Sequence, residues 1–184
     1  NRWYERYIFY NKNKKELSSK FLLLKKTSKD VLNFCNKNSG FIEYAPEIFK
    51  FISKISRLVK NHKNNCFMTI DYGYYDENFR NTLQALEKHQ KVNIFHNPGK
   101  VDITHLVNFK FINRIFEKNG LTRTLNMSQS DFLIEYGILA RLKQAKKNLK
   151  NKQDKIKLDM SVNRLIDKKQ MGNLFKVLLV TNEN

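Results

Sequence analysis

The sequence predicts an α/β fold, and three of its segments carry that prediction. Residues 66–73 form a short apolar run that closes with Asp71-Tyr72-Gly73. A run without polar alternation is typical of a buried parallel strand that is covered on both faces. The segment 46–59 has helical periodicity and feeds directly into this strand, an order typical of doubly wound folds. Residues 173–181 form a second strongly apolar strand.

The helix over residues 46–59 is the clearest one in the sequence. Pro46 suits its first position, where the missing N–H costs nothing. Its lysines and arginine lie off the apolar stripe, which is typical of a solvated face. We expect the stripe itself to face the sheet. It consists of Ile48, Phe51, Ile52, Ile55, Leu58 and Val59.

The first forty residues predict a β-hairpin followed by a surface loop. Residues 3–10 and 17–24 are rich in aromatic and apolar side chains, and a turn-like Asn11-Lys12-Asn13 follows the first of them. Residues 25–40 are polar and lysine-rich, with a possible short helix around Val31. We expect this connection to be a mobile surface loop.

The second half of the chain alternates helices and strands. Asn108 predicts the cap of a helix that Asn119-Gly120 ends. A strand is expected over residues 121–127, and a short helix capped by Ser128 or Ser130 should follow it. Further helices are expected over 139–149 and 159–168, before the final strand.

Composition narrows the classes of partner and compartment. The net charge of +18 in 184 residues would ordinarily suggest a nucleic acid or another anionic surface. However, the charge is mostly lysine and is spread along the chain, and the arginine forks that clamp phosphates are few. Nucleic acid is therefore disfavoured. The two cysteines predict a reduced interior without structural disulfides, and no apolar run is long enough to span a membrane.

The glycines exclude a clustered phosphate-binding loop. No two of the six lie closer than 17 residues apart: Gly40, Gly73, Gly99, Gly120, Gly137 and Gly172. Nucleotide-binding α/β folds need clustered glycines for a tight turn and a close backbone approach. If this is such a fold, we expect its cofactor loop to lie elsewhere.

Seven short motifs, taken in order, are similar to those of one protein family. They are Trp3-Tyr4-Glu5-Arg6, Ile42-Glu43-Tyr44-Ala45-Pro46, Ile70-Asp71-Tyr72-Gly73, Thr82-Leu83-Gln84-Ala85 with His89, Pro98-Gly99 with Asp102-Ile103-Thr104, Ser128-Gln129 with Phe132-Leu133, and Met171-Gly172-Asn173-Leu174-Phe175-Lys176-Val177. Each motif alone is weak, but seven in register resemble the MidA-like family of class I SAM-dependent methyltransferases. The eukaryotic branch of that family includes a mitochondrial protein-arginine methyltransferase.

The resemblance implies that the chain is the carboxyl-terminal part of a Rossmann-like class I methyltransferase sheet, with an added β-hairpin and a helical insertion. Residues 66–71, 121–127 and 174–180 would be its fifth, sixth and antiparallel seventh strands. We expect one partial domain over residues 1–184. Residues 1–40 would form its hairpin and loop, 41–127 and 173–181 its sheet core, and 128–172 its insertion.

The resemblance also implies S-adenosyl-L-methionine (SAM) as the cofactor of the complete parent enzyme. No residue of this chain is expected to bind SAM, because the family's glycine-rich loop would precede residue 1. The missing amino-terminal half, or a second copy of the chain, is expected at the open sheet edge. The expected substrate is a protein. The expected location is the cytoplasm for a bacterial protein and the mitochondrial matrix for a eukaryotic one.

The candidate site residues come from the strand end and the matched motifs. Asp71 and Glu43 are the first candidates for orienting a guanidinium substrate. Behind them stand the substrate-cleft candidates Tyr72, Gly73, Asp102 and Thr104. Each has a plainer alternative. Asp71-Tyr72-Gly73 also suits a turn that ends a strand, Glu43 a helix entry, and Asp102 with Thr104 an Asx-type turn.

One motif departs from the family pattern. The family usually has Asp-Ile-Thr-Ala-His-Val-Asp-Phe, whereas this chain has His105 one place early and Asn108 in place of the second aspartate. The resemblance therefore implies no role for either residue. His89, His96, Asp102 and His105 could be drawn as metal ligands, but nothing places them on one rigid element, and hydrogen-bonding imidazoles are favoured over a zinc site.

Two alternatives to the methyltransferase fragment stay open. In the first, the chain is a catalytically inactive remnant or partner-binding half of a split gene. In the second, it is a basic RNA-binding module. An in-frame glycine-rich segment encoded upstream would separate an active parent from a remnant. A steep salt dependence of RNA binding would favour the RNA-binding module.

Overall fold

The computed structural model describes residues 2–24, 40–43 and 45–182. They form two compact units. The first comprises Asn1–Tyr44 and Asn78–His105, and the second comprises Ala45–Glu77 and Leu106–Asn184. The expected mobile loop and its short helix lie, apart from Gly40, outside the described residues. That the chain acts as one partial domain stays a prediction.

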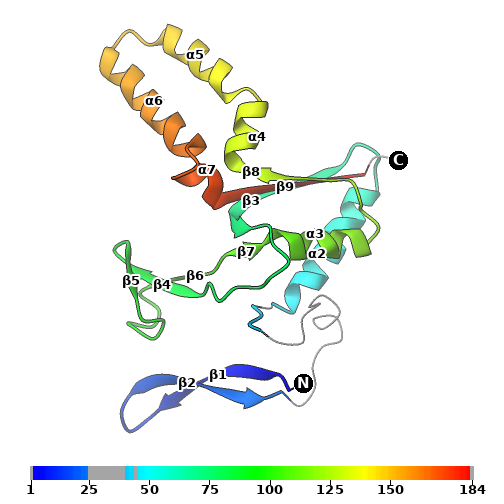
Figure 1. Cartoon of the computed structure of the whole chain (residues 1–184), viewed down its shortest axis with the longest axis vertical. Coiled ribbons are helices and arrows are strands. Elements are labelled where there is room, and N and C mark those ends of the chain that lie inside the picture. The colour runs from blue at the N-terminus through cyan, green and yellow to red at the C-terminus, as the bar shows by residue number, and fades with distance from the viewer. Residues whose placement is uncertain (1, 25–39, 44, 183–184) are drawn as a thin grey trace. The chain divides into compact units, whose positions relative to one another are not determined.

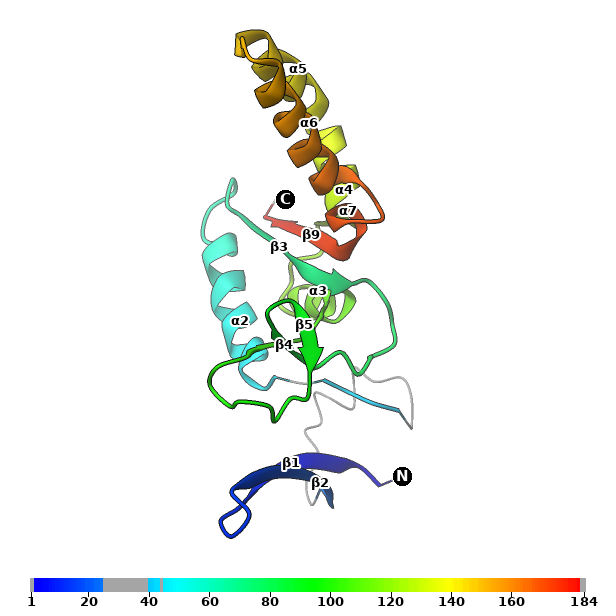
Figure 2. The same ribbon diagram turned by 90° about the vertical axis from the view of Figure 1, so that its left-hand side faces the viewer.

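The first unit begins with the predicted hairpin. Strands β1 (Tyr4–Asn11) and β2 (Glu16–Leu23) pair antiparallel, and the two strands twist about each other (Figure 2). The side chain of Asn11 accepts the backbone N–H groups of Asn13 and Lys14, which fixes the turn. Every residue of β1 is exposed.

The first unit also contains a small antiparallel sheet in the order β5-β4-β6. Its strands are β4 (Gln84–Glu87), β5 (Gln90–Val92) and β6 (Asp102–Thr104). Lys88 and His89 join β4 to β5 and both have positive φ, the backbone geometry of a tight two-residue hairpin turn. Ala85 in β4 is fully buried.

The second unit is built on a four-stranded sheet in the order β7-β3-β9-β8. Its strands are β3 (Cys66–Tyr74), β7 (Val107–Asn108), β8 (Thr124–Ser128) and β9 (Phe175–Thr181), shown in Figure 1. β9 is antiparallel to both β3 and β8, so those two strands run in the same direction. This confirms the strand arrangement that the resemblance implied.

Helices α2 (Glu47–Lys60) and α3 (Phe109–Lys118) form the core of the second unit together with this sheet. The ring of Phe67 in β3 lies 5.6 Å from that of Phe116 in α3. Asn108 caps α3 by accepting the N–H of Phe111, as predicted. Gly120, with φ +77°, follows its end. The buried apolar residues of these helices and of β9 are Ile52, Val59, Phe109, Phe111, Ile115, Phe116, Val177, Leu178 and Val180.

The apolar stripe of α2 is less buried than predicted. Ile52 and Val59 are buried, but Phe51 and Leu58 are more than half exposed. Ser56, which is not part of the predicted stripe, is buried between Ile52 and Val59 on the helix. Among the described residues, α2 packs against α3 and β3, which cover only part of the stripe.

The prediction that β3 is buried on both faces is wrong for this chain. Only Gly73 and Tyr74 of the strand are buried. Met68, Ile70 and Tyr72, which alternate along one face, are 50%, 39% and 45% exposed. Cys66 is also exposed. The described helices therefore leave this face of β3 largely uncovered.

A helical arm joins β8 to β9. It consists of α4 (Gln129–Glu135), α5 (Ile138–Asn148), α6 (Lys152–Ile166) and α7 (Met171–Leu174). Ser128 caps α4 as predicted, whereas α6 begins earlier than the predicted 159–168, at a cap formed by Asn151. Figures 1 and 2 show α5 and α6 as an antiparallel pair that projects from the sheet.

Two buried polar side chains anchor the arm at its base. Gln129 donates to the carbonyl of Leu165, and Ser130 donates to the carbonyl of Ile166 at the end of α6. In contrast, α5 has no buried residue and α6 has only Val162. None of the helices in the described part of the chain is long and apolar enough to cross a membrane.

Candidate functional site

The end of β3 carries three of the predicted site residues. Asp71 is exposed, and its Oδ1 accepts the backbone N–H of Tyr72 at 2.7 Å. The Tyr72 ring lies 4.0 Å, centroid to centroid, from that of Phe175, its partner on β9. Asp71 therefore presents a carboxylate at the surface, while the ring of its neighbour is held by stacking.

Gly73 is required for packing at this strand end. A Cβ at this position would lie 2.3 Å from the carbonyl oxygen of Val107 and 2.6 Å from a ring carbon of Phe109. The absence of a side chain lets β7 pair with β3 and lets α3 approach the strand. Gly73 is a close-packing position within this chain, so its predicted place in the substrate cleft stays a prediction.

An ion-pair cluster fixes the chain just beyond β3. Glu77 contacts the Lys110 ammonium at 2.9 Å and the Arg114 guanidinium at 2.6 Å, both on α3. Hydrogen bonds from these two cations hold the pKa of Glu77 below its usual value, and Glu77 in turn raises the pKa of Lys110. This cluster is not among the predicted site residues. The i, i+4 spacing of Lys110 and Arg114 was its only signal.

Lys176 of β9 lies opposite Asp71 in the sheet. Its ammonium donates to the carbonyl of Asn173 at 2.7 Å. Burial lowers the pKa of Lys176, an effect that the charge of Asp131 partly opposes. A hydrogen bond from Ser128 lowers the pKa of Asp131. The strand end thus combines an exposed carboxylate with a partly desolvated ammonium on the neighbouring strand.

Glu43, the second leading candidate, has a defined structural contact in the first unit. Its Oε1 accepts the backbone N–H groups of Thr82 and Leu83 at 2.7 and 2.8 Å, and its Oε2 accepts the Thr82 hydroxyl. Both carboxylate oxygens therefore hold the segment that leads into β4. Glu43 thus anchors this segment, and a contact between Glu43 and a substrate stays a prediction.

Asp102 and Thr104 lie on β6 of the small sheet. Thr104 pairs with Gln84 of β4, whose side-chain amide donates to the Thr104 hydroxyl at 3.3 Å. Asp102 pairs with Leu86. Both predicted residues are exposed. They belong to a regular strand and not to the Asx-type turn that the sequence allowed as the alternative.

The structure groups the six candidates by unit. It brings Asp71, Tyr72 and Gly73 together at the end of β3 in the second unit. In the first unit, Glu43 anchors the segment entering the sheet that contains Asp102 and Thr104. Each group is a surface of its own unit, and a shared cleft stays a prediction.

Among the predicted histidines, His96 is hydrogen-bonded within the first unit. His96 lies 3.2 Å from a Glu87 carboxylate oxygen and 3.0 Å from the Asn97 amide nitrogen. Within the described ranges, no three histidine, cysteine, aspartate or glutamate side chains are grouped so that they could hold a metal ion.

The residues present do not form a recognisable SAM-binding loop. The six glycines are widely separated in the sequence. Of the two in regular elements of the second unit, Gly73 packs against Val107 and Phe109, and Gly172 packs against the Ile166 and Asp167 carbonyls. Both use their missing side chains for internal packing, so we assign no residue of this chain to the cofactor.

Comparison with solved structures shows the fold. The chain superposes on an uncharacterized protein from Burkholderia thailandensis with a TM-score of 0.80 and 22% identity, covering 97% of this chain and 49% of that one. It also superposes on a likely methyltransferase from the same organism bound to S-adenosyl-homocysteine. That match has a TM-score of 0.78 and 23% identity, and covers 98% of this chain and 47% of the other. The fold is that of a class I methyltransferase, and this chain spans about half of each solved chain.

Sequence relatives point to the same family. The mitochondrial protein arginine methyltransferase NDUFAF7 of Xenopus tropicalis is 26% identical over 143 residues, which cover 78% of this chain and 33% of that protein. Its mitochondrial homolog in Caenorhabditis elegans is 28% identical over 109 residues, which cover 59% of this chain and 25% of that protein. Residues 1–127 match the family described as putative S-adenosyl-L-methionine-dependent methyltransferases. That match spans more than half of the chain, and the protein therefore belongs to this SAM-dependent methyltransferase family.

Proposed function

We propose that this chain is the carboxyl-terminal part of a protein-arginine N-methyltransferase whose cofactor-binding half lies outside the sequence. The family's cofactor is SAM, and two relatives are named as mitochondrial arginine methyltransferases. The chain covers about half of the solved structures that it resembles. We infer that a complementary half completes this fold in the whole enzyme.

The open edge of β3 is the observation that carries this proposal. On one side β3 pairs with β9 over Cys66–Tyr72. On the other side β7 pairs only with Gly73 and Tyr74, and within the described ranges no strand continues along that edge. The segment 66–72 has neither lysine nor proline to protect its free N–H and C=O groups. Such an edge favours the addition of another strand.

The exposed apolar side chains beside this edge support the same conclusion. Met68 and Ile70 on β3, and Phe51 and Leu58 on α2, remain between 39% and 59% exposed. α2 and β3 are in contact. A further strand and helix packed here would bury these side chains and would complete the α/β layering that the sequence of β3 predicts.

In the complete enzyme, Asp71 is our first candidate for contact with the substrate. Methyl transfer from a sulfonium needs alignment and exclusion of water more than strong acid or base catalysis. A carboxylate can align a guanidinium through forked hydrogen bonds. Asp71 lies near the carboxyl end of β3, the end at which ligands of open α/β folds bind, and its carboxylate is exposed. Tyr72, stacked on Phe175, would form the wall beside it.

Glu43 positions other residues of the first unit. Its carboxylate is hydrogen-bonded to Thr82 and Leu83, and the next residue, Gln84, contacts Thr104. We assign Glu43 to holding the segment before β4, which places Gln84 and the β6 residues Asp102 and Thr104. These three side chains then contribute a surface for the protein substrate.

The proposed location follows from the relatives. Both arginine methyltransferases matched by the sequence are named as mitochondrial. We assign the complete protein to the mitochondrial matrix if its source is eukaryotic and to the cytoplasm if it is bacterial.

Titration calorimetry with SAM tests the placement of the cofactor site. We expect the purified chain to show no measurable heat of binding, and sedimentation to show self-association through the open β3 edge. Micromolar one-to-one binding by a monomer would contradict the proposal. Sequencing the coding region upstream should reveal an in-frame glycine-rich segment.

The role of Asp71 is tested in that longer protein. We expect Asp71→Asn to lower methylation of an arginine-containing protein far more than it lowers the unfolding temperature, because the side chain is exposed and outside the core. Asp154→Asn is the matched control, since Asp154 is an exposed aspartate on α6, outside the candidate site. Equal turnover of wild type and D71N would remove Asp71 from the site. A longer protein that binds SAM but methylates no protein would favour an inactive remnant.

A further inference from the structure

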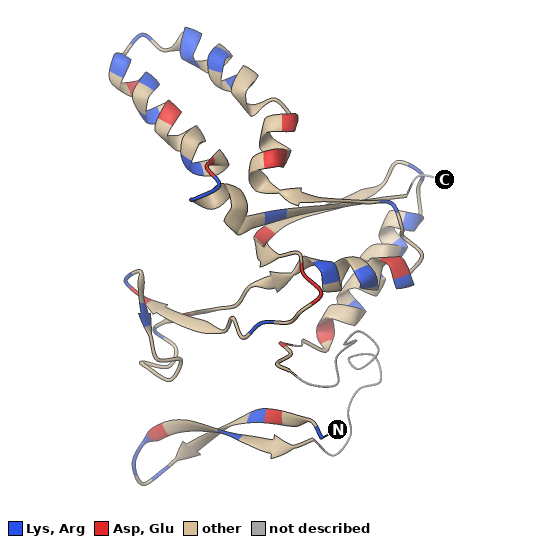
Figure 3. Cartoon of the chain, viewed as in Figure 1, with Lys and Arg blue, Asp and Glu red and all other residues tan. Residues whose placement is uncertain are grey.

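The α5–α6 pair concentrates the positive charge of the protein. Residues 138–166 contain nine of the 35 lysines and arginines of the chain but only two of its 17 acidic residues. The pair therefore carries +7 of the net +18 in less than a sixth of the length. Figure 3 shows basic residues on both helices and around the turn that joins them.

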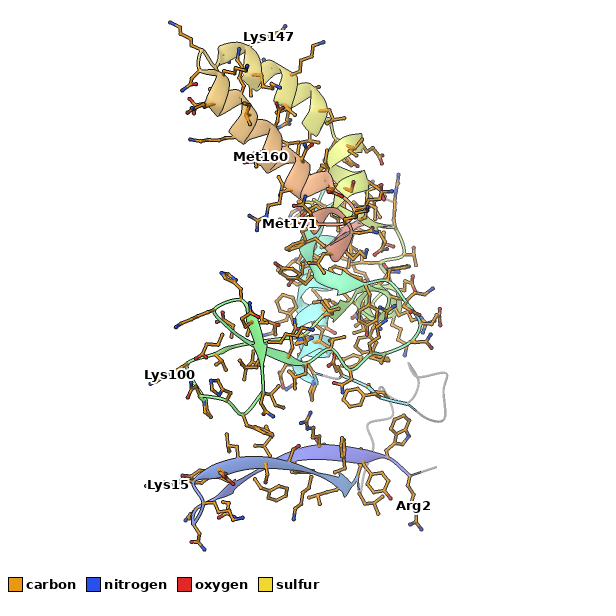
Figure 4. The ribbon with its side chains drawn as sticks, turned by 60° about the vertical axis from the view of Figure 1, so that its left-hand side comes forward. Arg2, Lys15, Lys100, Lys147, Met160 and Met171 are labelled. Atoms are coloured by element: carbon orange, nitrogen blue, oxygen red, sulfur yellow. The ribbon has the colours of Figure 1, made fainter. Side chains whose placement is uncertain are left out.

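The charge is not explained by packing within the arm. The two helices meet along a partly buried seam that includes Leu142, Leu158 and Val162. Lys146 and Asp159 form an ion pair across it at 2.5 Å. This pair uses one of the nine cations and one of the two aspartates. Most of the remaining basic residues are exposed, and Figure 4 shows Lys147 pointing outward near the end of the arm.

A second, independent feature is an amphipathic row along α6. Lys152, Ile156, Met160 and Arg164 follow each other at i, i+4 spacing and are all exposed. Ile156 is 49% exposed and Met160 66% exposed, the largest exposed fraction among the large hydrophobic residues of the described ranges. The row therefore has two aliphatic side chains at its centre and a cation at each end, over about 18 Å of helix.

We propose that the α5–α6 arm binds the surface of an anionic lipid bilayer. Clustered lysines are attracted to a negatively charged lipid surface. The aliphatic side chains of Ile156 and Met160 would enter the boundary between headgroups and acyl chains, while Lys152 and Arg164 stay at headgroup level. The helices do not cross the bilayer, so the arm attaches the protein to one surface.

The composition of the arm favours lipid over nucleic acid. Seven of its nine cations are lysine, which lacks the fork that clamps a phosphate in two places. Residues 138–166 contain no aromatic side chain on which an unpaired base could stack. A nucleic-acid backbone offers no apolar surface for the exposed side chains of Ile156 and Met160, whereas the acyl chains beneath the lipid headgroups do.

The arm stays accessible in the complete enzyme that we propose. It is connected to β8 and β9, whereas the open edge lies on the far side of β3. A complementary half added at β3 would therefore extend the sheet away from the strands that hold the arm. The residues matched by the family end at 127, before the arm begins.

Vesicle flotation with the full chain tests this proposal, because aggregates sink while vesicle-bound protein rises. We expect the protein to float with vesicles that contain about 30% phosphatidylserine, to remain at the bottom with phosphatidylcholine alone, and to lose binding as salt is raised. Lys147→Glu/Lys150→Glu/Lys152→Glu should weaken binding by about tenfold or more. Ile156→Ser/Met160→Ser should leave binding that salt abolishes more readily.

The matched control is Lys12→Glu/Lys14→Glu/Lys15→Glu at the exposed turn of the β1–β2 hairpin, which changes the net charge equally. It should float like the wild type. Circular dichroism should show that both triple variants remain folded. Equal loss of binding in the two triple variants would mean that binding depends on the total net charge and not on the arm, and would overturn the proposal. Equal flotation with neutral vesicles, or binding to transfer RNA without binding to lipid, would also overturn it.

Discussion

β3 and β9 are neighbouring strands with similar apolar sequences, yet their environments differ. Val177, Leu178 and Val180 of β9 are fully buried. Their partners across the ladder are less buried: Ile70 is 39% exposed, and Thr69 and Phe67 are only half-buried. β9 lies between two strands, whereas β3 has a second neighbour only at its last two residues.

The difference teaches that the apolar sequence of a strand indicates how buried the strand is in the complete fold. β3 has the composition of a strand covered on both faces, although the described residues cover only one. We interpret the excess of exposed apolar side chains as the surface that the proposed complementary half would cover. The predictions below measure how unequal the two strands are in this chain and whether a complementary half removes the inequality.

The largest expected effect is on β9. Leu178→Ala should lower the free energy of unfolding by about 2–5 kcal/mol, because it empties a fully buried site. Met68→Ala, on the exposed face of β3, should cost less than about 1 kcal/mol in this chain. Urea unfolding followed by circular dichroism gives both values.

The same pair of variants sharpens the comparison in the longer protein. If a complementary half covers β3, the cost of Met68→Ala should rise toward the value for Leu178→Ala, since Met68 would then be buried. A cost for M68A that is as large as that for L178A in the short chain would show that this face of β3 is already covered.

Gly73 is the exception on β3, because its end of the strand is packed as tightly as β9. Gly73→Ala should cost about 1–3 kcal/mol through overpacking, since the new Cβ would meet the carbonyl of Val107 and the ring of Phe109. Gly99→Ala is a suitable control, because a Cβ there has open space and only its positive φ opposes the change. A similar, small loss for both would show that β7 and α3 can shift away.

Local signals predicted where the main strands and helix caps lie, whereas the arrangement of the strands in the sheet was implied by the family resemblance. Asn108 and Ser128 were read as caps from their type and place before apolar runs, and both accept the expected backbone N–H. The burial of β3 and of the α2 stripe could not be predicted. Sequence periodicity gives the face of a helix, and it contains no information on whether a second layer is present to cover Phe51 or Leu58.

The site was predicted less completely than the fold. The motif containing Asp71 led to a strand end with an exposed carboxylate, but nothing in the sequence indicated that Glu43 contacts Thr82 and Leu83, about forty positions away. The ion-pair cluster of Glu77 with Lys110 and Arg114 of α3 was not predicted either, because its partners are also far apart in the sequence. Long-range pairing of charged side chains depends on how loops return to the core, which local pattern does not encode.

The smallest expected effect concerns this ion-pair cluster, which directs the chain away from the packed end of β3. Lys110 and Arg114 hold the pKa of Glu77 below its reference value of 4.5. A group whose pKa is depressed in the folded state contributes stability above its unfolded pKa and loses that contribution as the pH falls through the folded value.

Glu77→Gln should therefore lower the unfolding temperature slightly at neutral pH, and the difference from wild type should shrink below pH 4.5. Because these side chains are partly exposed, added salt should also reduce the difference. Glu47→Gln, which removes a more exposed pair with Lys50, should change the unfolding temperature less than E77Q does. A difference between wild type and E77Q that persists unchanged into acid would show that the contact acts through packing and not through charge.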